Sequence, residues 1–277
     1  MVKITTLIDN YAIEESSCKA EHGFSCFIEY EETRILFDTG QSDALLANAE
    51  KLGVDLSELD ILILSHAHYD HTGGVVPLLT QFPYERLHLY TGRGFELGKY
   101  AQEKEGLRYL GPDFDQQYLS SKNVMWHSTC CDTVMVRKGV WLLSQFDRVH
   151  PIEGMNKRFI VDNGVGVMKV DPFDDEVALV LDTPKGLVMI VGCSHPGILN
   201  MVDNLAHRFS KPLYALIGGI HLHDADEQRI NIVSDTLMER DISILATSHC
   251  TGDRAVEVLK NRHQGFVENR AGTVITI

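Results

Sequence analysis

A histidine-dense segment directly after a short apolar run constrains this chain more than any other feature. Residues 66–71 read His-Ala-His-Tyr-Asp-His, so three imidazoles and one carboxylate fall within six positions. Neutral imidazole suits zinc, iron and similar ions, and a carboxylate adds compensating charge. The apolar residues 61–64 are typical of a buried strand, which can hold ligands rigidly at a sheet edge, while Gly73 and Gly74 permit a sharp turn. The segment predicts a metal site; the alternative is a polar loop that happens to contain histidines.

The spacing within this segment suggests two neighbouring ions. His66 and His68 lie two positions apart, so at the end of an extended segment both rings can reach one ion. Asp70 and His71 can then face a second ion. A catalytic ion needs three or four ligands and keeps one position open for water, so further ligands are expected from elsewhere in the chain.

The length and composition of the chain limit the class of protein to which it can belong. With 277 residues, of which 44% are hydrophobic, the chain can bury a substantial core as one large α/β domain or two smaller ones. No apolar run approaches the roughly 20 residues of a membrane span, and the first ten residues do not resemble a secretory signal. We therefore expect a cytoplasmic location and no membrane partner.

Charge and cysteine usage narrow the expected partners. A formal net charge of −14 argues against nucleic-acid binding, which needs clustered Lys and Arg. A small-molecule substrate, anionic ones included, remains compatible because bound metal ions reverse the local charge. The six cysteines lack the spacing of a disulfide framework, so reduced thiols are expected. Cys193 and Cys250 each lie beside a histidine motif, as buried packing residues or as ligands, and packing is favoured for Cys250.

Hydrophobic periodicity predicts a strand-rich first third and alternating strands and helices after residue 174. Residues 92–160 carry no clear pattern, and we interpret them as a specificity insert, with peripheral decoration as the alternative. Three strand-to-loop junctions in the last third carry His195, His221 and His249, and such junctions gather binding groups in α/β sheets. The expected strands are 3–7, 25–30, 34–37, 61–64, 177–182, 187–191, 213–217 and 242–246, and the expected helices are 43–52, 75–81, 198–209, 227–240 and 254–261.

The motif at residues 66–71 resembles the signature of the metallo-β-lactamase superfamily. Residues 33–40, which end in Asp38-Thr39-Gly40, are similar to the strand and turn that precede this signature. Residues 191–197, 218–222 and 248–252 resemble one subgroup, the dihydropterin–ribofuranosylaminobenzene-phosphate synthase-like branch. The resemblance implies a four-layered αββα sandwich of the α/β class, formed as a single domain over residues 1–277, with the metals at one edge between two sheets.

The resemblance also implies metal ligands. His66 and His68 would bind one ion, and Asp70 and His71 the second ion, together with His249. Asp38 would accept hydrogen bonds and orient the motif. His22 could reach the same region, and a satisfied structural role is favoured for it.

The middle of the family pattern is where this chain departs from it. Asp174, Asp175 and Glu176 stand where many members carry a histidine, and Gly192-Cys193 stands in place of Gly-Asp. His195 could replace the missing imidazole as a ligand, which is the favoured interpretation. Alternatively, Cys193 could replace the bridging carboxylate as a thiolate.

The leading functional hypothesis is a metal-dependent hydrolase that acts on a small ester, lactone or phosphoester. Two divalent ions, zinc ahead of iron or manganese, would lower the pKa of water towards about 7 and polarise the substrate oxygen. Asp70 would be both a ligand and the group that orients the nucleophile. His221 would bind substrate or pass a proton to the leaving group, or else be structural.

Two rival hypotheses belong to other classes. The first is a metal-dependent transferase that joins a pterin methyl diphosphate to a ribosylated aminobenzene phosphate, as the resembling subgroup implies. The second is a non-catalytic metal-binding sensor, against which the full set of ligands at residues 66–71 argues. The sequence does not indicate an oligomeric state.

Overall fold

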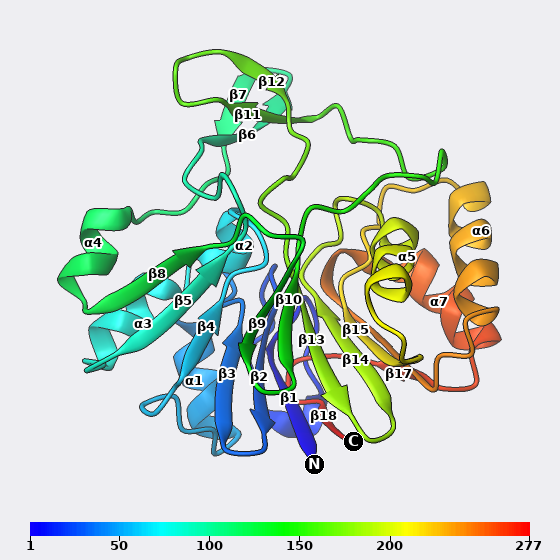
Figure 1. The fold of residues 1–277 in the computed structure, drawn as a ribbon, viewed down its shortest axis with the longest axis horizontal. Helices are drawn as coiled ribbons and strands as arrows, with labels where there is room; N and C mark the ends of the chain where they lie inside the picture. The colour runs from blue at the N-terminus through cyan, green and yellow to red at the C-terminus, as the bar shows by residue number, and fades with distance from the viewer. The chain divides into compact units, whose positions relative to one another are not determined.

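The computed structural model describes all 277 residues, Met1–Ile277, which form two compact units. The first unit comprises residues 1–129, 155–175 and 270–277, and the second comprises residues 130–154 and 176–269. Each unit holds a seven-stranded sheet with helices, and the first adds a four-stranded sheet (Figure 1). These sheets and helices confirm the predicted α/β class. The single domain over residues 1–277 and the insert at 92–160 stay predictions.

The large sheet of the first unit is mixed. Its strand order is β18-β1-β2-β3-β4-β5-β8. The pairs from β18 to β3 are antiparallel, whereas β3, β4, β5 and β8 run parallel, so their carboxyl ends lie at one edge. The residues after β3 and β4 therefore emerge close together. The strands are β1 (Val2–Ile8), β2 (Ser25–Tyr30), β3 (Thr33–Phe37), β4 (Ile61–Ile63), β5 (Leu87–Thr91), β8 (Val124–Ser128) and β18 (Val274–Thr276).

Two helices, α1 (Ala44–Lys51) and α3 (Val75–Gln81), pack on this sheet. Leu45 of α1 and Leu78 of α3 are fully buried in the same apolar cluster as Leu62 of β4. Burying one such side chain stabilises the fold by about 1.5–3 kcal/mol. These helices and the strands before them match the predicted elements to within one or two residues at each end.

Gly73 and Gly74 form the turn that the sequence predicts after the motif, with right-handed backbones whose φ angles are −69° and −80°. A Cβ at these positions would lie 2.4 Å from the carbonyl oxygen of Gln41 and 2.3 Å from that of Thr39. The glycines are therefore required for close approach of the chain after β3, which brings Asp38 against the histidine motif.

The four-stranded sheet of the first unit has the order β12-β11-β6-β7 and was not predicted from the sequence. Its strands are short, and all four residues of β7 are exposed, so they carry little hydrophobic alternation. Ala101, Leu110, Phe159 and Phe173 form a small buried cluster in this part of the unit. The strands are β6 (Lys99–Glu103), β7 (Gly106–Tyr109), β11 (Phe159–Asp162) and β12 (Met168–Val170).

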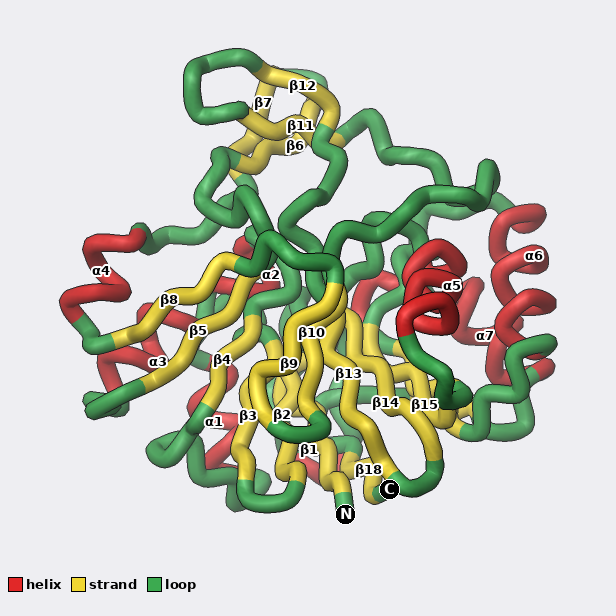
Figure 2. Tube along the Cα trace, in the orientation of Figure 1, coloured by secondary structure: helices red, strands yellow, loops and turns green.

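The sheet of the second unit has the order β17-β16-β15-β14-β13-β10-β9. Strands β14 to β17 are parallel, and β14 pairs antiparallel with β13 across the turn at residues 184–185. The parallel strands continue into loops at their carboxyl ends (Figure 2). The strands are β9 (Thr133–Arg137), β10 (Val140–Leu143), β13 (Ala178–Thr183), β14 (Gly186–Val191), β15 (Leu213–Gly218), β16 (Ile244–Thr247) and β17 (Phe266–Glu268).

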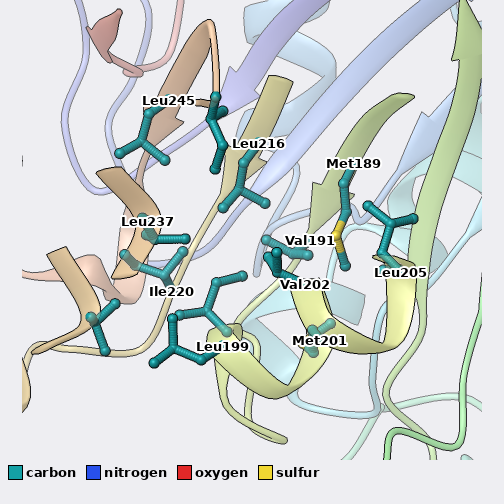
Figure 3. Close-up of a cluster of buried hydrophobic side chains, with 14 of the residues drawn as sticks. Met189, Val191, Leu199, Met201, Val202, Leu205, Leu216, Ile220, Leu237 and Leu245 are labelled. Atoms are coloured by element: carbon teal, nitrogen blue, oxygen red, sulfur yellow. The ribbon is translucent and has the colours of Figure 1, made fainter. Parts of the chain in front are cut away.

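Three helices cover this sheet: α5 (Ile198–Arg208), α6 (Glu227–Met238) and α7 (Asp253–Arg262). Figure 3 shows Val202 of α5 among buried side chains of β14 and β15, including Met189 and Leu216. The apolar positions of α5 recur at helical spacing, which is why the sequence predicts this helix correctly. No helix of the chain combines the length and apolar character that crossing a bilayer requires.

Candidate metal centre

Asp38, the residue after β3, organises the histidine motif in the first unit. Its carboxylate accepts the Ser65 backbone N–H at 2.7 Å and the Ser65 hydroxyl at 2.8 Å. It also lies 2.7 Å from Nδ1 of His71. Asp38 and His71 are both fully buried. The predicted role of Asp38 in orienting the motif is confirmed.

These hydrogen bonds select the tautomers of two rings. The single Ser65 hydroxyl hydrogen goes to Asp38, so the hydroxyl oxygen accepts from Nδ1 of His66 at 2.9 Å. Nδ1 of His71 likewise donates to Asp38, which places the lone pair of each neutral ring on Nε2. Burial, aided by the charges of His71 and His68, lowers the pKa of His66 well below its ordinary value. His66 is therefore neutral at pH 7, in the form that binds metals.

The rings and carboxylate of the motif gather closely. The ring centroid of His66 lies 4.6 Å from that of His68 and 4.3 Å from that of His71. Asp70 Oδ2 lies 3.7 Å from Nε2 of His71 and 3.2 Å from Nε2 of His22. His22 thus reaches the motif, which the sequence leaves open while favouring a structural role for it. Three buried imidazoles and a carboxylate in such proximity are a donor set that fits divalent metal ions.

A buried ion-pair network contacts the backbone of the histidine motif. The Asp175 carboxylate accepts the backbone N–H of Ala67, between the two histidines, at 2.9 Å. Its other oxygen lies 2.6 Å from Nζ of Lys99, which is also 2.9 Å from Asp171. Lys99 is 2% exposed, and the two carboxylates raise its pKa despite burial. This network holds the His66-Ala67-His68 backbone in place and was missed from the sequence.

The second unit brings three predicted histidines to one edge of its sheet. His195, His221 and His249 follow the carboxyl ends of the parallel strands β14, β15 and β16. The predicted placement at strand-to-loop junctions is confirmed. The ring centroids of His195 and His221 lie 4.4 Å apart.

Backbone hydrogen bonds join the three loops that carry these histidines. Gly219 donates to the Gly192 carbonyl at 3.0 Å, and Leu222 donates to the Cys250 carbonyl at 3.1 Å. Gly219 has no room for a side chain, because a Cβ would lie 2.6 Å from Sγ of Cys250. The loops therefore form one packed surface rather than three independent segments.

Glu176 positions the loop that contains His195. This fully buried carboxylate accepts the backbone N–H of Ser194 at 2.9 Å and that of His195 at 3.4 Å. Glu176 and Asp175 belong to the acidic stretch that stands where many superfamily members carry a histidine. Asp175 accepts the backbone N–H of Ala67, between His66 and His68, and Glu176 accepts those of Ser194 and His195. The acidic stretch immediately before a buried strand was the signal that could have revealed them.

Two cysteines lie beside the histidines of the second unit. One donor atom from each of Cys193, His221 and Cys250 falls within 4.8 Å of the others, and all three residues are buried. Burial raises the pKa of the Cys250 thiol, but hydrogen bonding with Cys193 and His221 outweighs it and leaves the pKa well below its ordinary value. Neither cysteine forms a disulfide bond. Cys250 is packed in the interior, as the sequence favours, and lies beside the donor atoms of Cys193 and His221.

Left-handed backbone conformations occur beside the histidine motif of the first unit and in the histidine-bearing loops of the second unit. Asp38, Ser194, His221 and His249 have φ between 48° and 61°, a region that non-glycine residues seldom adopt. Each such conformation costs of order 1 kcal/mol and persists only where surrounding contacts enforce it. Two of them, His221 and His249, are predicted site residues, and Asp38 and Ser194 hold neighbouring segments.

The chain belongs to the metallo-β-lactamase superfamily, whose family model matches residues 19–196. It is 31% identical over 291 aligned residues to the 7,8-dihydropterin-6-methyl-4-(β-D-ribofuranosyl)-aminobenzene-5′-phosphate synthase of Methanocaldococcus jannaschii. That alignment covers 99% of this chain and 96% of the synthase. The resemblance to the superfamily and its synthase-like branch is confirmed, and the chain is an enzyme of this superfamily.

Solved structures support the same fold. Tm1679, described as a metal-dependent hydrolase of the β-lactamase superfamily, superposes with a TM-score of 0.85 and 30% identity, covering 100% of this chain and 99% of its own. The metallo-β-lactamase fold protein YhfI of Bacillus subtilis superposes with a TM-score of 0.60 and 16% identity over the full length of both chains. The predicted metallo-β-lactamase fold class is confirmed.

Proposed function

We propose that this protein is a metal-dependent hydrolase that cleaves a small ester, lactone or phosphoester. The observation that carries the proposal is the buried set of His66, His68, Asp70 and His71, held by Asp38 at the carboxyl end of β4. Membership of the superfamily supports it, as does the full-length similarity to Tm1679, a metal-dependent hydrolase.

The proposed centre is built on the histidine motif of the first unit. His66 and His68 would hold one divalent ion, and Asp70 and His71 would hold the other. His195 and His249 are the further proposed ligands. Zinc suits these nitrogen and oxygen donors, and iron or manganese would be accepted by the same set. Bound ions would lower the pKa of water and polarise a carbonyl or phosphoryl oxygen.

The chain's own residues would supply orientation and a proton. Asp70, 7% exposed at the start of α2 (Tyr69–Thr72), would orient the attacking oxygen through its carboxylate. His221 would donate a proton to the leaving group. Asp38 would hold the histidine motif in position, and Glu176 would hold the loop that contains His195.

Chelation tests the metal requirement. Exhaustive removal of metal should abolish ester or phosphoester hydrolysis, and stoichiometric zinc, iron or manganese should restore it. Full activity in protein shown by elemental analysis to contain no metal would contradict the proposal.

A transferase is the second candidate, favoured by the near full-length similarity to the synthase. In that reaction the centre would assist departure of diphosphate from a pterin methyl diphosphate, and an arylamine would be the acceptor. Incubating the protein with both compounds distinguishes the two candidates. A condensed pterin–arylamine product supports the transferase, and only hydrolysed diphosphate ester supports the hydrolase.

A further inference from the structure

Residues 95–128 of the first unit enclose a cavity of about 630 Å³. This volume lies within the range of about 300–1,000 Å³ that is typical of small-molecule sites. All ten lining residues fall within residues 92–160, for which the sequence predicts a role in specificity. Four aromatic residues and two carboxylates dominate the lining: Phe95, Tyr109, Phe114, Trp126, Glu96 and Asp115.

Hydrogen bonds and a ring contact hold the aromatic side chains of the cavity. The indole Nε1 of Trp126 donates to the Thr91 hydroxyl at 2.9 Å. The ring of Phe95, which is 2% exposed, packs edge-on against Trp126 with centroids 6.3 Å apart. The Tyr109 hydroxyl donates to the Pro112 carbonyl at 3.1 Å. Rings fixed in this way lose little entropy when a flat ligand enters.

The polar groups of the cavity favour hydrogen-bond donors. Glu96 and Asp115 are both exposed, and none of the ten lining residues is basic. Asp115 Oδ1 accepts the Tyr118 N–H at 2.8 Å, which leaves Oδ2 to meet a ligand. Ionised carboxylates only accept hydrogen bonds, so they attract N–H groups and cations and repel anions.

We propose that this cavity binds a planar aromatic or heteroaromatic ring that carries N–H donors, such as amino or amidino groups. One backbone hydrogen bond connects the cavity-lining segment to the metal motif, because the carbonyl of Leu110, next to Tyr109, accepts the Tyr69 N–H at 2.7 Å. Tyr69 lies between His68 and Asp70. That the bound ring belongs to the substrate rests on the proposed function, whereas the binding itself does not.

Three isosteric probes test the charge preference: benzamidine, benzamide and benzoate. Trp126 and Trp141 are the two tryptophans, so Trp141→Phe makes Trp126 the single fluorescent reporter and keeps an aromatic ring at position 141. Benzamidine should quench Trp126 with a Kd at least about tenfold below that of benzoate, with benzamide between them. Equal affinities, or quenching by none of the probes, would overturn the proposal.

Three conservative variants then locate the contact. Glu96→Gln and Asp115→Asn should each reduce the preference for benzamidine over benzoate about threefold or more, and Asn preserves the helix cap at position 115. Asp113→Asn removes a nearby exposed carboxylate that does not line the cavity and is the matched control. Equal loss in the control would show a long-range charge effect and refute direct contact.

The same titration in His68→Ala separates this proposal from the function. Unchanged benzamidine binding is expected there even if metal and turnover are lost. Binding in both proteins without hydrolysis of any ester would leave the cavity assignment standing and reject the proposed hydrolase. Loss of the charge preference in an active, metal-loaded enzyme would reject the cavity assignment and leave the proposed hydrolase standing.

Discussion

Replacing Lys99 by methionine tests whether the buried ion-pair network supports the metal motif. Its ammonium lies 2.6 Å from Asp175 and 2.9 Å from Asp171, and all three side chains are at most 3% exposed. Methionine fills a similar volume but leaves two buried carboxylates without their cation. Removing one partner of a buried pair costs about 3–5 kcal/mol of unfolding free energy.

Lowering the pH should reduce this loss of unfolding free energy. Burial already raises the pKa of Asp171 despite the nearby Lys99, and without that cation the pKa should rise further. Protonation below the raised pKa removes the uncompensated charge, so the difference between the variant and the wild type should shrink as the pH falls from 7 to 5. Urea unfolding at pH 7 and at pH 5 measures this difference in unfolding free energy. Elemental analysis measures the effect on metal binding, which Asp175 would transmit through its hydrogen bond to the Ala67 N–H.

The control is an exposed lysine on β12. Lys169→Met removes the same charge from the surface and should change the unfolding free energy by less than about 0.5 kcal/mol. If Lys99→Met also costs under about 1 kcal/mol at pH 7, the network contributes no more than a surface pair. The reasoning about buried charge would then be refuted.

Three further predictions concern the ligands, a buried carboxylate and a glycine. His68→Ala should lose metal and turnover together, whereas His221→Ala should keep its metal and lose about 10²–10⁴-fold in rate; equal metal loss by elemental analysis would make His221 a ligand. Burial raises the pKa of Glu153 above its ordinary 4.5, so the folded protein binds this proton more tightly than the unfolded chain does. The wild type should therefore lose stability relative to Glu153→Gln as the pH rises from 4.5 through the raised pKa, and parallel urea midpoints across that window would disprove it. Gly73→Ala should cost about 1–3 kcal/mol, because its Cβ would meet the Gln41 carbonyl at 2.4 Å, and an unchanged urea midpoint would argue against this contact.

Much of the metal motif was predictable because its members are adjacent in the chain. His66, His68, Asp70 and His71 follow a recognisable strand, and their chemistry can be read from spacing alone. Asp38 was also predictable, since its turn after β3 matches a known pattern, and its hydrogen bonds to Ser65 and His71 confirm the role.

The local sequence marks the supporting carboxylates only as an acidic stretch before a strand, and it does not predict their partners. Asp175 pairs with Lys99, 76 residues away, and with the Ala67 amide, 108 residues away. In the sequence these residues look like ordinary surface charges. Only the folded chain shows that they are buried and that their partners are backbone amides of ligand-bearing segments.

The sequence by itself determined the periodic helices and strands, the set of potential metal-ligating side chains at residues 66–71, and the superfamily. These properties are local, because they depend on side-chain types at short, fixed spacings. The tertiary structure alone decided that Lys99 and Glu176 are buried, that the glycines after the motif serve close approach, and that four aromatic rings surround a cavity. Desolvation, close contact and cavity shape depend on segments far apart in the chain, and no local pattern encodes where those segments meet.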